Sequence, residues 1–392
     1  MRRFCIFLFV IGHFSFSAAQ SQHDSALHKY WSIEPSFHLG YIVKNSGDVP
    51  ESNHPSSFQL TIAVQTNGSK DWHHIFGFPE VGCSVFLWDL GNRKELGRMA
   101  GIVPNITFNT QADRWYTPHI NLGLGLAFFE KQYDYYANPA DFYIGSKITA
   151  FACASVFVTP SLGQHLNLKT GFMVAHCSNG HYQVPNLGIN LPSVFLGFAY
   201  APRQIPKRFV RKDIVVPDSK IRFNIRTGVG VHELADTKGP VLTPKYAIYV
   251  NDIYLSKRYG KASNVQLGIE VNHYNSFYNY IVKHDFFSAQ QRLKATVMGV
   301  FLAHELMISR FSLLTQGGIN VYNQFYDKYI ERNGNTSDFK NVTKKIFATR
   351  LGVQYYLFDP NYCTRSNVFI GAYIKANFGQ ADFICSQIGF VF

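Results

Sequence analysis

The sequence has few charged residues and, beyond its N-terminus, no long apolar run. Charged residues make up 16% of the 392, whereas a soluble protein of ordinary composition carries roughly a quarter. The most apolar stretches, 150–158 and 300–303, fall short of the ~20 residues that a membrane-spanning helix needs. No Cys-x-x-Cys pair or His/Cys cluster has zinc spacing. These absences exclude a helical membrane protein and a zinc site, and they argue against an ordinary soluble protein.

The N-terminus has the layout of a secretory signal peptide. A positive start at Met1–Arg3 precedes a mostly apolar stretch over 4–16, and Ser17-Ala18-Ala19 supplies small residues for cleavage after Ala19. We therefore expect residues 1–19 to be removed as the mature chain leaves the cytoplasm. Five cysteines would remain, and this odd number argues against a disulfide framework.

Aromatic residues, by contrast, are abundant at 16%, and a period-two alternation runs through most of the chain. In its clearest form an apolar set (Ile221, Phe223, Ile225, Thr227, Val229, Val231) alternates with a basic or small set (Lys220, Arg222, Asn224, Arg226, Gly228, Gly230). A strand between lipid and a wet lumen needs such a pattern, and alternating segments separated by turns are typical of outer-membrane barrels. A soluble, secreted all-β protein is the alternative.

The alternation predicts an all-β fold, an antiparallel transmembrane outer-membrane β-barrel of about 14–16 strands. The expected strands are 35–44, 57–65, 79–90, 97–107, 114–128, 145–158, 164–178, 189–200, 219–232, 242–254, 263–274, 293–306, 310–322, 344–358, 366–377 and 382–392. A basic, proline-containing connection over 201–218 separates a half at 20–200 from one at 219–392. We favour one barrel completed by the C-terminal strands; the alternative is an eight-stranded unit followed by a second β unit.

The last residues and the net charge both suit an outer membrane. Apolar residues alternate from Ile384 to the terminal Phe392, which resembles the final strand that the barrel-assembly machinery of Gram-negative bacteria reads. The formal net charge is +12. For an exported barrel the natural anionic partner is the phosphate-rich surface of lipopolysaccharide rather than nucleic acid.

A candidate site lies where the strand 164–178 ends. His176 and Ser178 share the parity of its apolar residues, and two positions on a strand are roughly 6.6 Å apart. Asn190 has the same parity on the next strand, so all three side chains should face lipid. Seven strands precede the loop 179–188, which we therefore expect on the extracellular side. Polar groups facing lipid are costly and often functional; simple tolerance in the headgroup zone is the alternative.

The motif His-x-Ser-Asn at 176–179, followed by Pro-Asn-x-Gly-Ile at 185–189, resembles the active-site signature of the PagL-type lipid A 3-O-deacylases of the acyloxyacyl hydrolase-like group. The resemblance covers residues 175 to about 200. It implies an outer-membrane hydrolase with its site on the outer wall of an eight-stranded barrel, cleaving an ester-linked acyl chain of lipid A. It does not account for the half beyond residue 218.

Carried over by position, the resemblance implies that Ser178 is the nucleophile and His176 its base. Asn179 and Gly180 would stand where a backbone N–H or a side-chain amide could form an oxyanion hole. Asn186 and Gly188 match the second block of the motif and would shape the loop and pocket. We expect the flanking His181 and Tyr182 to lie in an ordinary exposed loop.

The sequence departs from the family at Asn190, where the family's small enzymes have a glutamate. An asparagine can orient a histidine but cannot stabilise an imidazolium as a carboxylate does. The first hypothesis is thus a serine esterase acting on lipid A, with Asn190 holding the imidazole and no metal or organic cofactor required. The second is a non-catalytic barrel, either lipopolysaccharide-binding or a pore whose basic lumen residues, such as Arg222 and Arg226, favour anions.

Overall fold

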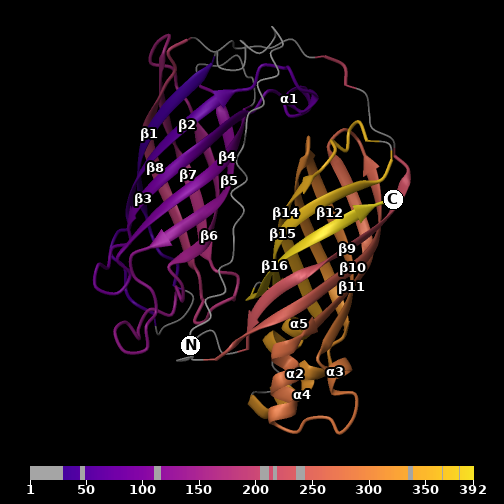
Figure 1. Ribbon diagram of the computed structural model, residues 1–392. Coiled ribbons are helices and arrows are strands. Elements are labelled where there is room, and N and C mark those ends of the chain that lie inside the picture. Colours follow the sequence, from indigo (N-terminus) through magenta and orange to yellow (C-terminus); the bar gives the residue numbers. More distant parts are fainter. Residues whose placement is uncertain are drawn as a thin grey trace, which may run out of the picture.

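The computed structural model describes residues 30–44, 49–109, 116–203, 212–214, 219–234, 243–333, 339–363, 365–378 and 380–392, which form two closed β-barrels (Figure 1). The expected signal peptide, residues 1–19, lies outside the described residues, as does most of the connection 201–218. Among the described residues, no helix is both long and apolar enough to cross a membrane.

The first barrel is an antiparallel meander of eight strands. They are β1 (Trp31–Gly40), β2 (Ser56–Gln65), β3 (Glu80–Asp89), β4 (Arg98–Asn109), β5 (Pro118–Phe129), β6 (Ile148–Val158), β7 (Leu166–Ser178) and β8 (Ile189–Tyr200). Each strand pairs with the next, and β8 returns to pair with β1, Phe37 standing opposite Leu196. The sheet is therefore closed before the chain reaches the second half.

The second barrel repeats this plan. Its strands are β9 (Ile221–Glu233), β10 (Lys245–Tyr259), β11 (Ser263–Tyr274), β12 (Thr296–Ile308), β13 (Phe311–Tyr322), β14 (Phe347–Tyr356), β15 (Asn367–Asn377) and β16 (Gln380–Val391). Strand β9 pairs with both β10 and β16 and so closes the ring.

The all-β barrel class and the sixteen strands are confirmed, but the preference for a single barrel is wrong. The structure has the alternative arrangement, an eight-stranded unit followed by a second closed unit of eight. Alternation states which face each residue takes, but not with which strand the last strand of a sheet pairs. The closing partner of β8 could not be inferred for that reason.

The two faces of the strands separate as the alternation predicts. In β9 the side chains of Ile221, Phe223 and Val229 are exposed on the outer wall, whereas Asn224 and Arg226 are buried in the lumen. An eight-stranded barrel has an interior just wide enough for side chains to fill. Side chains therefore occupy the space that a pore would need.

Both barrels point the same way. We call the end at which the odd-numbered strands finish the odd end. The helices α2 (Asn275–Lys283), α3 (Gln291–Lys294), α4 (Gln324–Asn333) and α5 (Phe339–Ile346) gather there on the second barrel, whereas α1 (Asp71–Ile75) lies at the opposite end of the first (Figure 1). The loop after β7 is bonded to the end of β9, since the Val184 N–H donates to the Glu233 carboxylate at 3.0 Å. The two odd ends are therefore adjacent.

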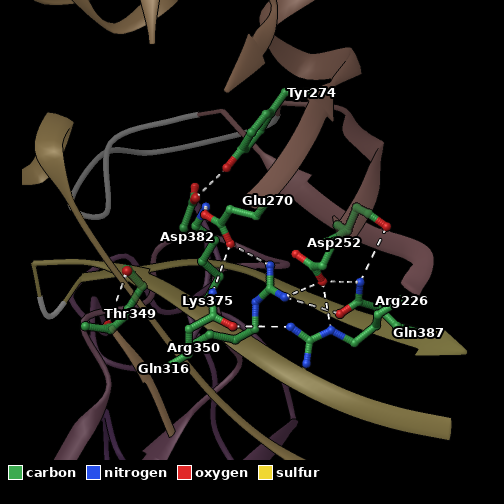
Figure 2. A network of polar contacts seen from close by, with 12 residues as sticks. Arg226, Asp252, Glu270, Tyr274, Gln316, Thr349, Arg350, Lys375, Asp382 and Gln387 are labelled. Carbon is green, nitrogen blue, oxygen red and sulfur yellow. Dashed lines mark hydrogen bonds and ion pairs between the residues drawn. The ribbon is translucent and has the colours of Figure 1, made fainter. Parts of the chain in front are cut away.

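An ion network fills the lumen of the second barrel (Figure 2). Asp252 accepts hydrogen bonds from Arg226 and Arg350, each at 2.8 Å, and Arg350 also donates to Glu270 at 2.9 Å. Lys375 forms a further ion pair with Glu270. Arg226, which the pore hypothesis placed along an open lumen, is fully buried and bonded to Asp252.

Because Arg350 bridges both carboxylates, its removal should be costly. Arg350→Ala leaves Asp252 and Glu270 buried with one cation each, and breaking a buried pair typically costs about 3–5 kcal/mol. We expect the variant, refolded in detergent, to unfold at a lower urea midpoint. Unfolding is measured as the loss of the heat-modifiable band of the folded protein on gels. Lys257→Ala, which removes an exposed cation of the same barrel, is the control. Equal midpoints for the two variants would contradict a stabilising role of the network.

Candidate active site

The strands β7 and β8 bring His176 and Asn190 directly opposite one another. The imidazole Nδ1 lies 2.7 Å from the amide Oδ1 of Asn190. An amide oxygen only accepts, so Nδ1 carries the proton and donates it. This bond holds the imidazole in the tautomer whose Nε2 has a lone pair, the form that a general base requires.

The ring of His176 lies on the outer wall, beside Gly188. The side chains of His176, Phe172 and Val174 are all exposed on this face of β7, as their parity predicts. Gly188 has a φ of +71°, and a Cβ added there would stand 3.0 Å from Cε1 of His176. A glycine is thus needed both for the backbone turn and for the position of the ring.

Ser178 shares this parity but is shielded, with 7% of its surface exposed. Its Oγ accepts hydrogen bonds from the Gly180 N–H at 3.2 Å and from Nδ2 of Asn186 at 2.9 Å. Both acceptor positions of the hydroxyl are then occupied, and its own proton is left to donate. Within the part of the chain that the structure describes, Ser178 and His176 are not hydrogen-bonded to each other; such bonds are often long before substrate is present.

The other predicted residues have two different roles: some contact the Ser178 hydroxyl, and others form bonds that hold the loop. Asn179 uses its side chain within the loop, donating to Gln183 O at 2.7 Å and accepting from the His181 N–H at 2.9 Å. The Gly180 N–H, rather than the Asn179 amide, therefore points at the serine oxygen. Asn186, expected only to shape the loop, contacts Ser178 as well. Matching residues by spacing could not separate these roles, because they depend on how the loop 179–188 folds back.

A neighbouring loop, between β5 and β6, holds the end of the site loop. The Leu187 and Gly188 N–H groups donate to Phe142 O at 3.1 Å and Tyr143 O at 3.0 Å. Asp141 stabilises this loop by accepting the Ile144 N–H at 3.3 Å. Burial raises the pKa of the Asp141 carboxyl to about 7. Asp141 accordingly supports the backbone beneath Gly188 and does not take the place of the missing family glutamate beside His176.

The second barrel forms the other support of the site loop. Besides the bond from Val184 to Glu233, Lys245 donates to Oε1 of Gln183 at 2.9 Å. His181 is only 5% exposed, and its imidazole lies 5.8 Å from that of His232, centroid to centroid. The expectation of an ordinary exposed loop is therefore wrong for His181, because a surface far away in the sequence covers it.

A contact with the wall of the second barrel lies close to Ser178. A Cβ at Gly180 would overlap the methyl group of Ile384, a residue of β16, with Ile374 of β15 close by. Gly180 also has a φ of +63°. The sequence holds no local signal for this contact, since parity places Ile384 on an outer wall but does not say what lies against that wall.

These features define an outer-membrane type of barrel, in duplicate, with a Ser/His loop at the junction. Residues 56–199 match the family model described as lipid A 3-O-deacylase (PagL), and residues 221–392 match the one described as acyloxyacyl hydrolase, C-terminal domain. The first barrel thus matches the lipid A 3-O-deacylase family, and the second matches the acyloxyacyl hydrolase C-terminal domain.

Solved structures give similarities of low identity. The outer membrane enzyme PagL is 17% identical, with 42% of this chain and 97% of that chain covered and a TM-score of 0.30. Neisserial surface protein A is 9% identical, with 43% and 96% covered and a TM-score of 0.31. No curated protein matches the chain.

The bond from Val184 to Glu233 can be tested by hydrogen exchange. A hydrogen bond to a charged group contributes about 1.5–3 kcal/mol, so Glu233→Ala should speed exchange of the Val184 amide by about tenfold to a hundredfold. Glu331→Ala, which removes an exposed carboxylate paired with Lys328, is the control and should leave that amide unchanged. Equal protection in both variants would show that the second barrel does not restrain the loop.

Proposed function

We propose that the chain is a serine esterase of the outer membrane that removes an ester-linked acyl chain from lipid A of lipopolysaccharide. The observation that carries the proposal is the hydrogen bond between His176 and Asn190 on the outer wall, two positions from a serine whose oxygen is held by two N–H donors. The match of residues 56–199 to the lipid A 3-O-deacylase family supports the substrate class.

The position of the site suits a lipid substrate. Exposed apolar side chains of β7 and β8, such as Phe172, Leu196 and Phe198, continue the outer wall away from His176. Transmembrane barrels have short turns on the periplasmic side and longer loops outside, and the helices of the second barrel stand at the odd end. We infer that the odd ends face the cell exterior. His176 then lies at the outer leaflet, where the acyl esters of lipid A are found.

The chemistry follows from the donors and acceptors present. Nε2 of His176 takes the Ser178 proton as Oγ forms a bond to the acyl carbonyl carbon. The Gly180 N–H and Nδ2 of Asn186, which donate to Oγ before the attack, then donate to the oxyanion that forms beside Oγ. The C–O bond to the sugar breaks, and the sugar oxygen leaves with the proton from Nε2. Water then attacks the acyl-enzyme, gives one proton to Nε2 and releases the fatty acid, while Oγ regains its proton. The proposed reaction uses no metal or organic cofactor.

Asn190 sets the expected strength of this base. Its Oδ1 fixes the tautomer as a carboxylate would, but it carries no charge to stabilise the imidazolium that forms. The proposed enzyme is therefore slower than one with a carboxylate at this position.

The role of Ser178 can be tested on lipopolysaccharide itself. Incubation with the refolded protein should lower the mass of lipid A by one acyl chain, and Ser178→Ala should abolish that loss because the nucleophile is absent. Ser193→Ala, which alters a lumen-facing hydroxyl beside His38, should retain the activity. Mass spectra that stay unchanged with the native protein would overturn the proposal.

Substitution of Asn190 tests whether this residue orients His176 from the acid position. Asn190→Glu should raise kcat, since the added charge stabilises the imidazolium, and Asn190→Leu should lower it at least tenfold through loss of the tautomer-fixing bond. The rates are measured by release of fatty acid at constant lipopolysaccharide. If Asn190→Glu were no faster than the native protein, Asn190 would not occupy the acid position.

A further inference from the structure

A cavity of about 280 Å³ opens at the odd end of the second barrel. Strand ends of the second barrel and the helices α2, α4 and α5 surround it, and His181, from the site loop of the first barrel, completes its wall. The volume is close to the lower limit of small-ligand sites, roughly 300–1,000 Å³. It suits a single small ring rather than an acyl chain.

One side of the cavity is aromatic. The rings of Tyr274 and Phe277 stack with centroids 4.1 Å apart, and Phe277 stacks on Phe325 at 4.0 Å. Tyr326 and Tyr329 of α4 also line the cavity. The stacked rings form a rigid apolar wall, against which the C–H face of a flat or ring-shaped ligand can pack.

The other side is polar, and its unpaired atoms are acceptors. Oδ1 of Asn320 and Oδ1 of Asn377 are buried without a hydrogen-bond partner. Asp382 is buried and lines the same cavity. The Tyr274 hydroxyl donates to its Oδ2 at 2.7 Å (Figure 2), and Nε2 of His232 lies 3.7 Å from its Oδ1. A buried acceptor without a partner costs about 1–3 kcal/mol. A ligand that supplies several donors would remove that cost.

We propose that this cavity binds one sugar ring of a glycan. A pyranose presents C–H groups on one face and hydroxyl donors around its edge, which matches an aromatic wall opposite carbonyl and carboxylate oxygens. A phosphate fits poorly, because it brings acceptors to acceptors and negative charge to Asp382. A quaternary ammonium has no N–H or O–H donor for the two asparagine oxygens, and Lys344 also lines the cavity.

The sugar site is separate from the esterase chemistry but adjoins it. His181 lies three residues beyond Ser178 and packs against His232, so a bound sugar contacts the loop that carries the nucleophile. Only the identity of the glycan rests on the proposed function. A lipopolysaccharide whose lipid A lies at Ser178 would present its saccharide at the same odd end.

The test is titration of the whole refolded protein in detergent with neutral methyl glycosides and short neutral oligosaccharides, followed by saturation-transfer NMR and calorimetry. At least one of these should bind, and both Asn320→Leu and Asn377→Leu should weaken its binding at least tenfold. Asn320→Asp, which keeps an acceptor oxygen, should retain it. Inorganic phosphate and tetramethylammonium serve as comparison probes, and neither should compete.

The outcomes separate the two proposals. Three results would each overturn the sugar site. They are binding to none of the saccharides, native affinity in Asn320→Leu and Asn377→Leu, and competition by tetramethylammonium or phosphate. Hydrolysis of a short soluble ester should be unchanged in Asn320→Leu, since that residue does not contact Ser178. Saccharide binding without Ser178-dependent deacylation would support the sugar site and overturn the esterase. Ser178-dependent deacylation without saccharide binding would support the esterase and overturn the sugar site.

Discussion

Closure of each sheet at eight strands is the constraint on which the rest of the structure depends. A sheet in a bilayer cannot leave edge N–H and C=O groups unpaired, so the ring must close. Eight strands leave an interior that side chains fill. Lumen residues such as Arg226, Asp252 and Arg350 must then pair with one another inside the barrel, as their ion pairs show. Chemistry with an external substrate is confined to the outer wall and the strand ends.

The candidate site lies where the outer wall meets the strand ends. His176 takes its position from the outer face of β7, and Ser178 from the point at which that strand turns into its loop. The loop is held by backbone bonds to residues 142–143 and by side chains of the second barrel, Glu233 and Lys245. The loop that carries Ser178 is thus supported by two closed sheets, which keep a polar group in a fixed position at the end of β7.

Local pattern accounts for much of this arrangement. Alternation and the turns between segments located all sixteen strands, and parity placed His176 on the outer wall. Cys177, of the opposite parity, lies in the interior against Met99. The closure of β8 on β1 was missed because period two does not encode pairing partners. The burial of His181, the Ile384 contact and the bond from Asn186 to Ser178 were missed because each depends on tertiary folding. The roles assigned to His176, Ser178 and Asn190 stay predictions, which the geometry supports.

The contact between Gly180 and Ile384 links the site to the order in which the protein is assembled. Ile384 belongs to β16, the last strand, which closes the second ring by pairing with β9. Until that strand is in place, the loop bearing Ser178 lacks one of its supporting walls, even where the first ring is already closed. The contacts of the Ser178 loop are therefore complete only when both rings are closed, so the last strand of the chain contributes to the shape of a loop in the first barrel.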